Sequence, residues 1–235
     1  MIPWLSEPPD FPAPDEALSE PPGLLAAGGA LSPAWLLAAY HRGIFPWFNE
    51  GEPILWWSPD PRMVLIPTEV RVSRSLGKRL RRGEFEVRID SAFDAVIAAC
   101  AAARGPAVGT WISPDIRAAY GRMHELGHAH SIESWQDGRL VGGLYGIALG
   151  RVFFGESMFA RVTDASKVAL VHLARLLAAH DFVLIDCQMS TGHLQSMGAR
   201  EIGRAEFTTG LASWTLEQPS GWPWTGADRI DAARN

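Results

Sequence analysis

Cysteine is almost absent from this chain. Its 235 residues include only Cys100 and Cys187, which lie far apart in the sequence. Secreted folds that depend on disulfides carry many more cysteines at short spacings. The sequence therefore excludes a disulfide framework and predicts a reduced, cytoplasmic protein.

Long apolar runs are also missing. No segment reaches the roughly 18 consecutive apolar residues expected of a membrane span. The N-terminal residues MIPWLSEPPDFPAPDE carry proline and acid, where a secretory signal would have basic residues followed by an apolar stretch. We expect no association with membranes.

An excess of basic charge is missing as well. The net charge is −5, so no global basic field points to nucleic acid. The hydrophobic share of 47% and the charged share of 20% are those of an ordinary globular protein. The length allows one large domain or two small ones.

Caps and turn residues divide the first half of the chain. Residues 1–23 are rich in proline and are expected to lie extended over the surface. A helix is predicted between Ser32, a good N-cap followed by proline, and Gly43, which suits a left-handed C-cap. The aromatic segment 44–62 is expected to form a folded loop with short strands around it. Further elements are predicted over 71–83 (a basic helix), 85–89 (a strand), 90–104 and 113–127 (helices).

The second half begins with a pattern typical of strands. HSIESWQ and RLVGGLYGIAL flank Asp137-Gly138 and predict a hairpin, which RVFFGESMF extends as a third antiparallel strand. A helix over 164–179, a strand over 182–187 and a short helix near 193–197 follow. This order predicts an α+β fold. We expect a small aromatic-rich N-terminal domain over 1–62 and a larger domain with a central mixed sheet over 63–235.

HELGH at 124–128 matches the H-E-x-x-H pattern of zinc proteases. That chemistry requires both histidines on one helical face. Here Gly127 interrupts the helix, and no third ligand follows at a suitable position. We expect no metal site and interpret His124 and His128 as helix-end and turn residues.

One basic run contains no acid: Arg71, Arg74, Lys78, Arg79, Arg81 and Arg82. A solvated helix face is the usual explanation for such a run. The alternative is a patch that contacts phosphates without reading a nucleotide sequence. Several tryptophans could stack on splayed bases, although most belong in the core by default: Trp47, Trp56, Trp57 and Trp111.

The segment 153–188 places four polar side chains among apolar neighbours. Such groups either form a satisfied buried network or act on a ligand. Strand alternation predicts that Asp186 and Gln188 share a face, where they could orient an amine and accept its proton. Lys167, in the first turn of a helix, suggests an ion pair with Glu156 or a contact with a ligand anion.

Cys187 is a weaker candidate, as a nucleophile. No histidine is clearly paired with it, and its neighbours give no reason for a lowered pKa. His193 keeps this alternative open.

These motifs occur together in a known order. The chain contains the blocks EPPGLLAAGGALSP, YHRGIFPWF, PILWWSPDPR, TWI, HELGHAHSIESW, LVGGLYG, FFGESMF, ASK, LIDCQ and HLQSMGA. Along nearly its full length it resembles the bacterial leucyl/phenylalanyl-tRNA–protein transferases. Departures are small: Ala30 stands where an acid commonly precedes Leu-Ser-Pro, and Leu144 stands where some members have Met.

The resemblance implies transfer of Leu or Phe, and less well Met, from aminoacyl-tRNA to proteins with an N-terminal Arg or Lys. The product has a destabilising N-terminus, which the N-degron degradation pathway recognises. An acetyltransferase-like (GNAT-type) C-terminal domain is also implied. Acetyltransferases hold coenzyme A with a glycine-containing loop after the central strand, whereas this chain has ARVTDASK there. The acyl group is therefore expected to arrive on tRNA, without cofactor or metal.

The resemblance also implies residue roles. Gln188, hydrogen-bonded to Asp186, would position the attacking amine, and these two are the expected catalytic residues. Trp47 and Trp111 would hold the terminal adenosine. Glu156 would face a cation, either the aminoacyl amine or the acceptor's Arg or Lys. The pocket for the transferred side chain would be lined by Leu144, Phe153, Met158, Leu170 and Ile185.

With this resemblance, the basic run from Arg71 to Arg82 becomes the expected contact with the tRNA backbone. Two other hypotheses remain open. One is a coenzyme A-dependent N-acyltransferase; the other is a non-catalytic module that binds tRNA or N-degrons, which would not need Asp186 with Gln188. We expect a monomer.

Overall fold

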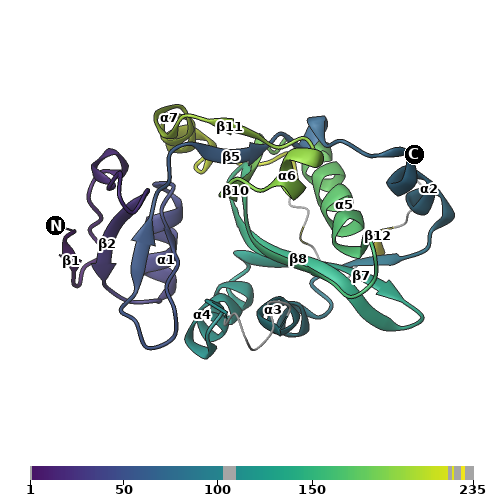
Figure 1. Cartoon of the computed structure of the whole chain (residues 1–235), viewed down its shortest axis with the longest axis horizontal. Helices are drawn as coiled ribbons and strands as arrows, with labels where there is room; N and C mark the ends of the chain where they lie inside the picture. The colour runs from purple at the N-terminus through teal and green to yellow at the C-terminus, as the bar shows by residue number, and fades with distance from the viewer. Residues whose placement is uncertain (1, 103–109, 222–223, 225–228, 231–235) are drawn as a thin grey trace.

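The chain folds into two β-sheets flanked by helices (Figure 1). The structure is a computed structural model that describes residues 2–102, 110–221, 224 and 229–230. The first sheet has four strands and the second has eight, with both parallel and antiparallel pairs. The predicted α+β fold with mixed sheets is confirmed.

The smaller sheet belongs to the N-terminal part of the chain. It contains β1 (Trp4–Leu5), β2 (Leu24–Gly28), β3 (Phe45–Pro46) and β4 (Leu55–Trp57), in the spatial order β1-β2-β4-β3. The 3-10 helix η1 (Pro14–Glu16) and α1 (Pro33–Tyr40) accompany it. As predicted, the Ser32 side chain caps α1 and Gly43 has a left-handed backbone.

The first 23 residues are more than a surface extension. Leu5 and Phe11 are buried, and the Phe11 ring packs edge-on against Trp35 and Trp56 at centroid distances of 5.5 and 4.8 Å. The expectation for this segment was wrong because proline content says nothing about which isolated apolar side chains reach the core.

The larger sheet collects strands from the rest of the chain, and the chain enters it at Arg62. Its strands are β5 (Arg62–Leu65), β6 (Glu86–Ile89), β7 (Ala129–Gln136), β8 (Arg139–Leu149), β9 (Val152–Ala160), β10 (Leu184–Gln188), β11 (Arg200–Ile202) and β12 (Arg229–Ile230). Their spatial order is β11-β5-β10-β9-β8-β7-β6-β12. A division into domains at residue 62 stays a prediction.

Helices follow the predicted positions closely. The described helices after α1 are η2 (Pro67–Glu69), α2 (Arg74–Arg82), α3 (Phe93–Ala102), α4 (Pro114–Glu125), α5 (Ala165–Ala179), α6 (Gly192–Ser196) and α7 (Arg204–Trp214). The sequence did not predict α7, and residues 103–104 of the expected helix over 90–104 lie outside the described residues. The predicted Asp137-Gly138 hairpin turn is confirmed, with φ of 50° and 71°. None of the described helices has the length and apolar character needed to span a bilayer.

Helices cover both faces of the larger sheet. In Figure 1, α5 lies on one face while α3 and α4 lie on the other. Core residues of β8 divide accordingly: Leu144 and Ala148 pack in the cluster of α5, whereas Tyr145 and Ile147 pack in the cluster of α3 and α4. Burial on both faces explains why β8 carries no charged residue after Arg139.

The parallel pair β9 and β10 separates part-way along its length. Their register joins Leu184 to Val152 and Asp186 to Phe154, and no further pairing between them follows in the described chain. Both strands nevertheless continue, β9 to Ala160 and β10 to Gln188. The candidate site lies at this divergence.

Candidate active site

A cavity of about 410 Å³ opens at the divergence of β9 and β10. Side chains from β3, β8, β9, α5, β10 and α6 line it. All eight predicted substrate-binding residues are among its lining residues: Trp47, Trp111, Leu144, Phe153, Glu156, Met158, Leu170 and Ile185. Gln188 lines the cavity as well, whereas Asp186 does not.

Both strands at the cavity contain a β-bulge. Tyr145 pairs with Ser157 and Gly146 pairs with Gly155, so Glu156 is an extra residue in β9. In β10, Cys187 is the extra residue opposite β5, and Gln188 has φ of 60°. A bulge shifts the following side chains to the opposite face. This shift brings Phe153 and Met158, five positions apart, into one cavity.

The same effect overturns the expectation that Asp186 and Gln188 share a face. Gln188 lines the cavity, while Asp186 is completely buried outside it. Asp186 accepts a bidentate pair of bonds from Arg62, with Nε–Oδ1 at 2.8 Å and Nη2–Oδ2 at 2.7 Å. Its Oδ1 also accepts the main-chain N–H of Gln188 at 2.9 Å. Asp186 therefore holds the main chain of Gln188. The side-chain amide of Gln188 bonds to Glu156 instead.

Sequence reasoning missed Arg62. Its guanidinium is 1% exposed, donates to the Gly43 carbonyl at 3.1 Å and lies 5.0 and 4.7 Å from the ring centroids of Phe45 and Phe207. The signal that could have revealed it is a lone cation at the first position of an otherwise apolar strand, because a buried charge requires a partner.

Glu156 has three hydrogen-bonding partners. Its Oε1 lies 2.6 Å from the Tyr40 hydroxyl oxygen and accepts from Gln188 Nε2 at 2.9 Å, and its Oε2 lies 2.9 Å from the Tyr120 hydroxyl oxygen. Burial raises the pKa of Glu156 to about 7. The suggested ion pair with Lys167 was wrong, because Lys167 Nζ bonds to Asp164 at 3.0 Å.

Comparison with known sequences agrees with this geometry. Residues 64–212 match the family described as Leucyl/phenylalanyl-tRNA protein transferase, and residues 29–60 match the family described as its N-terminal domain. The chain belongs to the leucyl/phenylalanyl-tRNA–protein transferase family. It is therefore an aminoacyltransferase that acts on aminoacyl-tRNA and protein substrates.

Relatives match over almost the whole chain, and all three described here carry the name leucyl/phenylalanyl-tRNA–protein transferase. The relative from Azoarcus sp. is 68% identical over 96% of each chain. The one from Aromatoleum aromaticum is 65% identical over 100% of this chain and 99% of its own. The one from Chromohalobacter salexigens is 62% identical over 98% and 91%, respectively.

In this member of the family, Cys187 is poorly suited to nucleophilic attack. Burial raises the pKa of its thiol, whereas a nucleophile needs the thiolate. Its Sγ lies 3.8 Å from the Ile185 carbonyl oxygen. Nε2 of His193 is buried in the cavity wall without a hydrogen-bond partner in the described part of the chain, and burial lowers the pKa of this imidazole.

The tryptophans take different positions. Trp47 is 37% exposed and Trp111 is 7% exposed, and both line the cavity. Trp57 supports Trp47, with ring centroids 5.4 Å apart and its Nε1–H bonded to the Trp47 carbonyl at 2.6 Å. Trp56 is completely buried and belongs to the core. Two of the four tryptophans thus remain available to a ligand in the cavity.

None of the cations of the basic run lines the cavity. The run is centred on α2, which is at the opposite end of the molecule from the N-terminal sheet (Figure 1). Arg79 pairs with Glu84 at 2.9 Å and with Asp164 at 3.3 Å. Within the described residues four of its cations form no ion pair: Arg71, Arg74, Lys78 and Arg81. A contact with tRNA stays a prediction.

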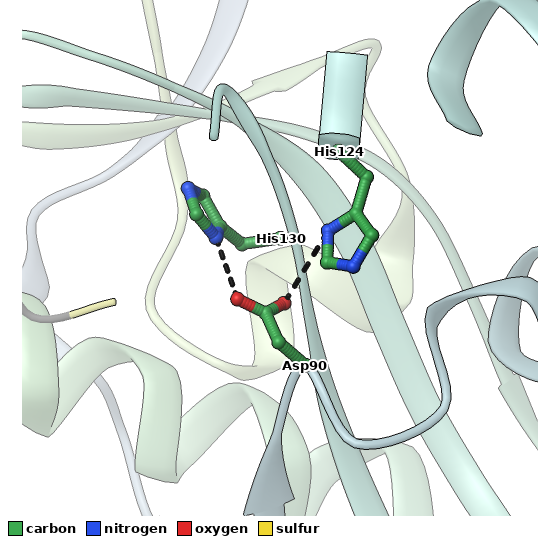
Figure 2. Close-up of side chains that lie close together, drawn as sticks. All are labelled: Asp90, His124 and His130. Carbon is green, nitrogen blue, oxygen red and sulfur yellow. Dashed lines mark hydrogen bonds and ion pairs between the residues drawn. The ribbon is translucent and has the colours of Figure 1, made fainter. Parts of the chain in front are cut away.

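The HELGH motif does not form a zinc-protease site. Helix α4 ends at Glu125, so His128 lies beyond it. Figure 2 shows instead His124 and His130 beside Asp90, with Nδ1–oxygen distances of 3.9 and 2.7 Å. In the described chain these three form the group with metal-ligand spacing.

Each member of this group already has another protein partner. His124 Nδ1 lies 2.8 Å from the Ala129 oxygen, His130 Nε2 lies 3.1 Å from the Gly127 oxygen, and Asp90 Oδ1 accepts the Ser131 N–H at 2.7 Å. A nitrogen that donates to a carbonyl has no lone pair for a metal. We interpret the group as a hydrogen-bonded clamp that joins α4, β6 and β7.

Proposed function

We propose that the cavity binds the aminoacyl end of Leu-tRNA or Phe-tRNA, and less well Met-tRNA, and transfers the amino acid to the α-amine of proteins with an N-terminal Arg or Lys. The observation that carries this proposal is the convergence of an apolar wall, the Gln188 amide and the Glu156 carboxyl on one cavity. The product would have a destabilising N-terminus for the N-degron pathway.

The apolar wall supports the choice of amino acid. Leu144, Phe153, Leu170 and Ile185 come from four different elements, and Met158 adds a flexible thioether that adapts to aliphatic and aromatic shapes. A pocket of this kind discriminates by about 10–200-fold per methylene. Side chains branched at Cβ should therefore be poor substrates without being fully excluded.

The reaction requires little beyond positioning. The aminoacyl ester is already activated, so attack by the amine on the ester carbonyl breaks the bond to the terminal ribose, and the amine proton leaves with that oxygen. Holding the two groups together supplies much of the barrier reduction. Gln188 would accept a hydrogen bond from the amine. Asp186 would act as a positioning residue, because it holds the main chain of Gln188 and does not contact the cavity.

The remaining parts of tRNA would contact more distant surfaces. Trp47 and Trp111 would stack on the terminal adenosine, since both line the cavity. The cations of the basic run would contact the tRNA backbone: Arg71, Arg74, Lys78, Arg79, Arg81 and Arg82. The divergence of β9 from β10 supports a GNAT-type fold for the larger sheet, and ARVTDASK after β9 has no glycine with which to hold coenzyme A. The enzyme would work as a cytoplasmic monomer.

Incubation with radiolabelled Leu-tRNA and a peptide that begins with Arg tests this function. We expect label in the peptide, and none when the α-amine is acetylated. A matched peptide that begins with Gly should accept little label. Active Leu-tRNA that gives no labelled peptide, while a known family member succeeds under the same conditions, would overturn the proposal.

A further inference from the structure

Glu156, which lines the cavity, forms a closed ring of oxygen contacts with two tyrosines behind it. Tyr40 comes from α1, Tyr120 from α4, and Glu156 from the bulge of β9. The Tyr40 hydroxyl lies 2.6 Å from Glu156 Oε1, the Tyr120 hydroxyl lies 2.9 Å from Oε2, and the two hydroxyls also form a short contact with each other. Each of the three groups therefore touches both of the others.

This ring contains more contacts than an ionised Glu156 can satisfy. A tyrosine hydroxyl has one hydrogen to donate, and a carboxylate has none. Burial raises the pKa of both tyrosines well above the ordinary value, so both hydroxyls are neutral. With Glu156 ionised, only two hydrogens would be available for three oxygen–oxygen contacts. In one of these contacts, two oxygen atoms would face each other with no hydrogen between them. A third hydrogen, on the carboxyl, supplies the missing bond.

The surroundings of Glu156 also favour its neutral form. Tyr40 and Tyr120 are completely buried, and in the described chain no Lys, Arg or His forms an ion pair with this carboxyl. The negative charge of Asp186, which is itself paired with Arg62, also opposes ionisation of Glu156. Tyr145 of β8 stands beside Tyr120, with ring centroids 5.7 Å apart.

We propose that Glu156 carries a proton in the resting enzyme and closes a hydrogen-bonded ring with Tyr40 and Tyr120 that orients the amide of Gln188. The carboxyl Oε2–H donates to Tyr120, Tyr120 donates to Tyr40, and Tyr40 donates to Oε1. Gln188 Nε2 also donates to Oε1. The amide nitrogen is thereby held toward Glu156, and the amide oxygen stays available to the cavity. Glu156 is thus a positioning residue and not the binding site for a cation.

The pH dependence follows from the raised pKa. Burial moves the pKa of Glu156 from 4.5 to about 7 in the folded protein. Because the folded state binds this proton more tightly than the unfolded chain, the contribution to stability is complete below pH 4.5 and is lost as the pH rises through about 7. Glu156→Gln removes this dependence, since its amide donates from nitrogen and accepts at oxygen at every pH.

Infrared difference spectroscopy tests the protonation state without any substrate. The difference between the intact protein and Glu156→Gln, taken one pH unit below that pKa, should contain the carbonyl band of a neutral carboxylic acid. This band should disappear as the pH is raised through the pKa. Glu133→Gln is a matched control, because that buried glutamate of the same sheet has four hydrogen-bonding partners but does not line the cavity, and this variant should keep the band. A carboxylate band from Glu156 below the pKa overturns the proposal.

The role in orientation rests on the proposed function and is tested by transfer. Glu156→Ala should lower kcat about tenfold or more, the loss expected when a positioned group is released. Glu156→Gln should retain most of the kcat that the Ala variant loses. Its rate should also not fall at pH values above the pKa of Glu156, because glutamine does not ionise. A Gln variant as poor as the Ala variant would show that the negative charge is required and would overturn the ring. If the intact protein itself transfers no Leu, the proposed function is wrong. The infrared experiment would still test the protonation of Glu156, because it uses no substrate.

Discussion

Two glutamates of the larger sheet have different surroundings. Glu133 lies in a regularly paired part of β7 and accepts from the Ala92 N–H at 3.0 Å, the Ser131 hydroxyl at 2.8 Å and two further donors. Glu156 lies at a bulge of β9, faces a cavity, and contacts two hydroxyls that also contact each other. Each of the four contacts of Glu133 has its own donor. The three contacts within the ring of Glu156, Tyr40 and Tyr120 share only two hydroxyl hydrogens unless the carboxyl carries a third.

Asp186 adds a third arrangement to this comparison. It is as buried as Glu133, but its charge is balanced by Arg62 and not only by neutral donors. Removing one member of a buried ion pair leaves the other charge without compensation. The three acids should therefore respond to substitution in different ways.

The largest effect on stability is expected for Asp186→Ala. It should lower the free energy of unfolding by about 3–5 kcal/mol, because Arg62 remains buried and unpaired. Glu133→Ala should cost less, about 1–3 kcal/mol, because it leaves only neutral donors unsatisfied. Urea unfolding measures both. The double variant Arg62→Met/Asp186→Leu should recover much of the stability; if it does not, the ion pair is not the cause of the loss.

Gln188→Ala should separate activity from stability. Transfer should fall by about 10²-fold, because the attacking amine loses its orienting acceptor. The free energy of unfolding should change by no more than about 1 kcal/mol, since only one partly exposed side-chain bond is lost. Glu133→Ala should lower the free energy of unfolding but leave the transfer rate nearly unchanged, when the rate is measured well below the unfolding temperature of this variant. Equal losses of transfer rate in the two variants would show that Gln188 and Glu133 do not differ in their importance for the reaction.

A smaller effect is expected for the apolar wall. Leu170→Ala enlarges the cavity and should raise the preference for Phe over Leu by about tenfold. Leu177→Ala is the matched control, because Leu177 is equally buried on α5 but does not line the cavity. Competition between Leu-tRNA and Phe-tRNA measures the ratio. A shift of the same size in the control would mean that general loosening of α5, and not cavity shape, sets the preference.

The smallest effect concerns single cations of α2. Arg81→Ala should reduce the slope of the logarithm of tRNA affinity against the logarithm of salt concentration by about one. This is the change expected when one phosphate contact is lost. Arg79→Ala should reduce it less, because Arg79 is already paired with Glu84 and Asp164. Filter binding over a range of salt concentrations measures both slopes. Unchanged slopes in both variants would indicate that α2 is a solvated helix face that does not contact tRNA.

Much of the fold could be predicted from local patterns. The Asp137-Gly138 turn, the caps at Ser32 and Ser113, and the apolar periodicity located the hairpin and helices because these signals act within a few residues. Elements without such signals were missed, among them β2 and α7. The N-terminal segment was also misjudged, since the burial of Phe11 depends on tryptophans that follow much later in the chain.

Through its resemblance to a known family, the sequence by itself determined a set of residues that gather at the site. The eight substrate-binding predictions all line one cavity, and the motifs that carry them place the chain in its family. Only the tertiary structure decided how these side chains are oriented. Bulges in β9 and β10 arise from pairing with neighbouring strands, so alternation within one strand could not reveal that Gln188 enters the cavity while Asp186 turns away. The partners of Asp186 and Glu156, namely Arg62, Tyr40 and Tyr120, are distant in sequence, and the hydrogen bonds that set their charge exist only once the sheet and helices have packed.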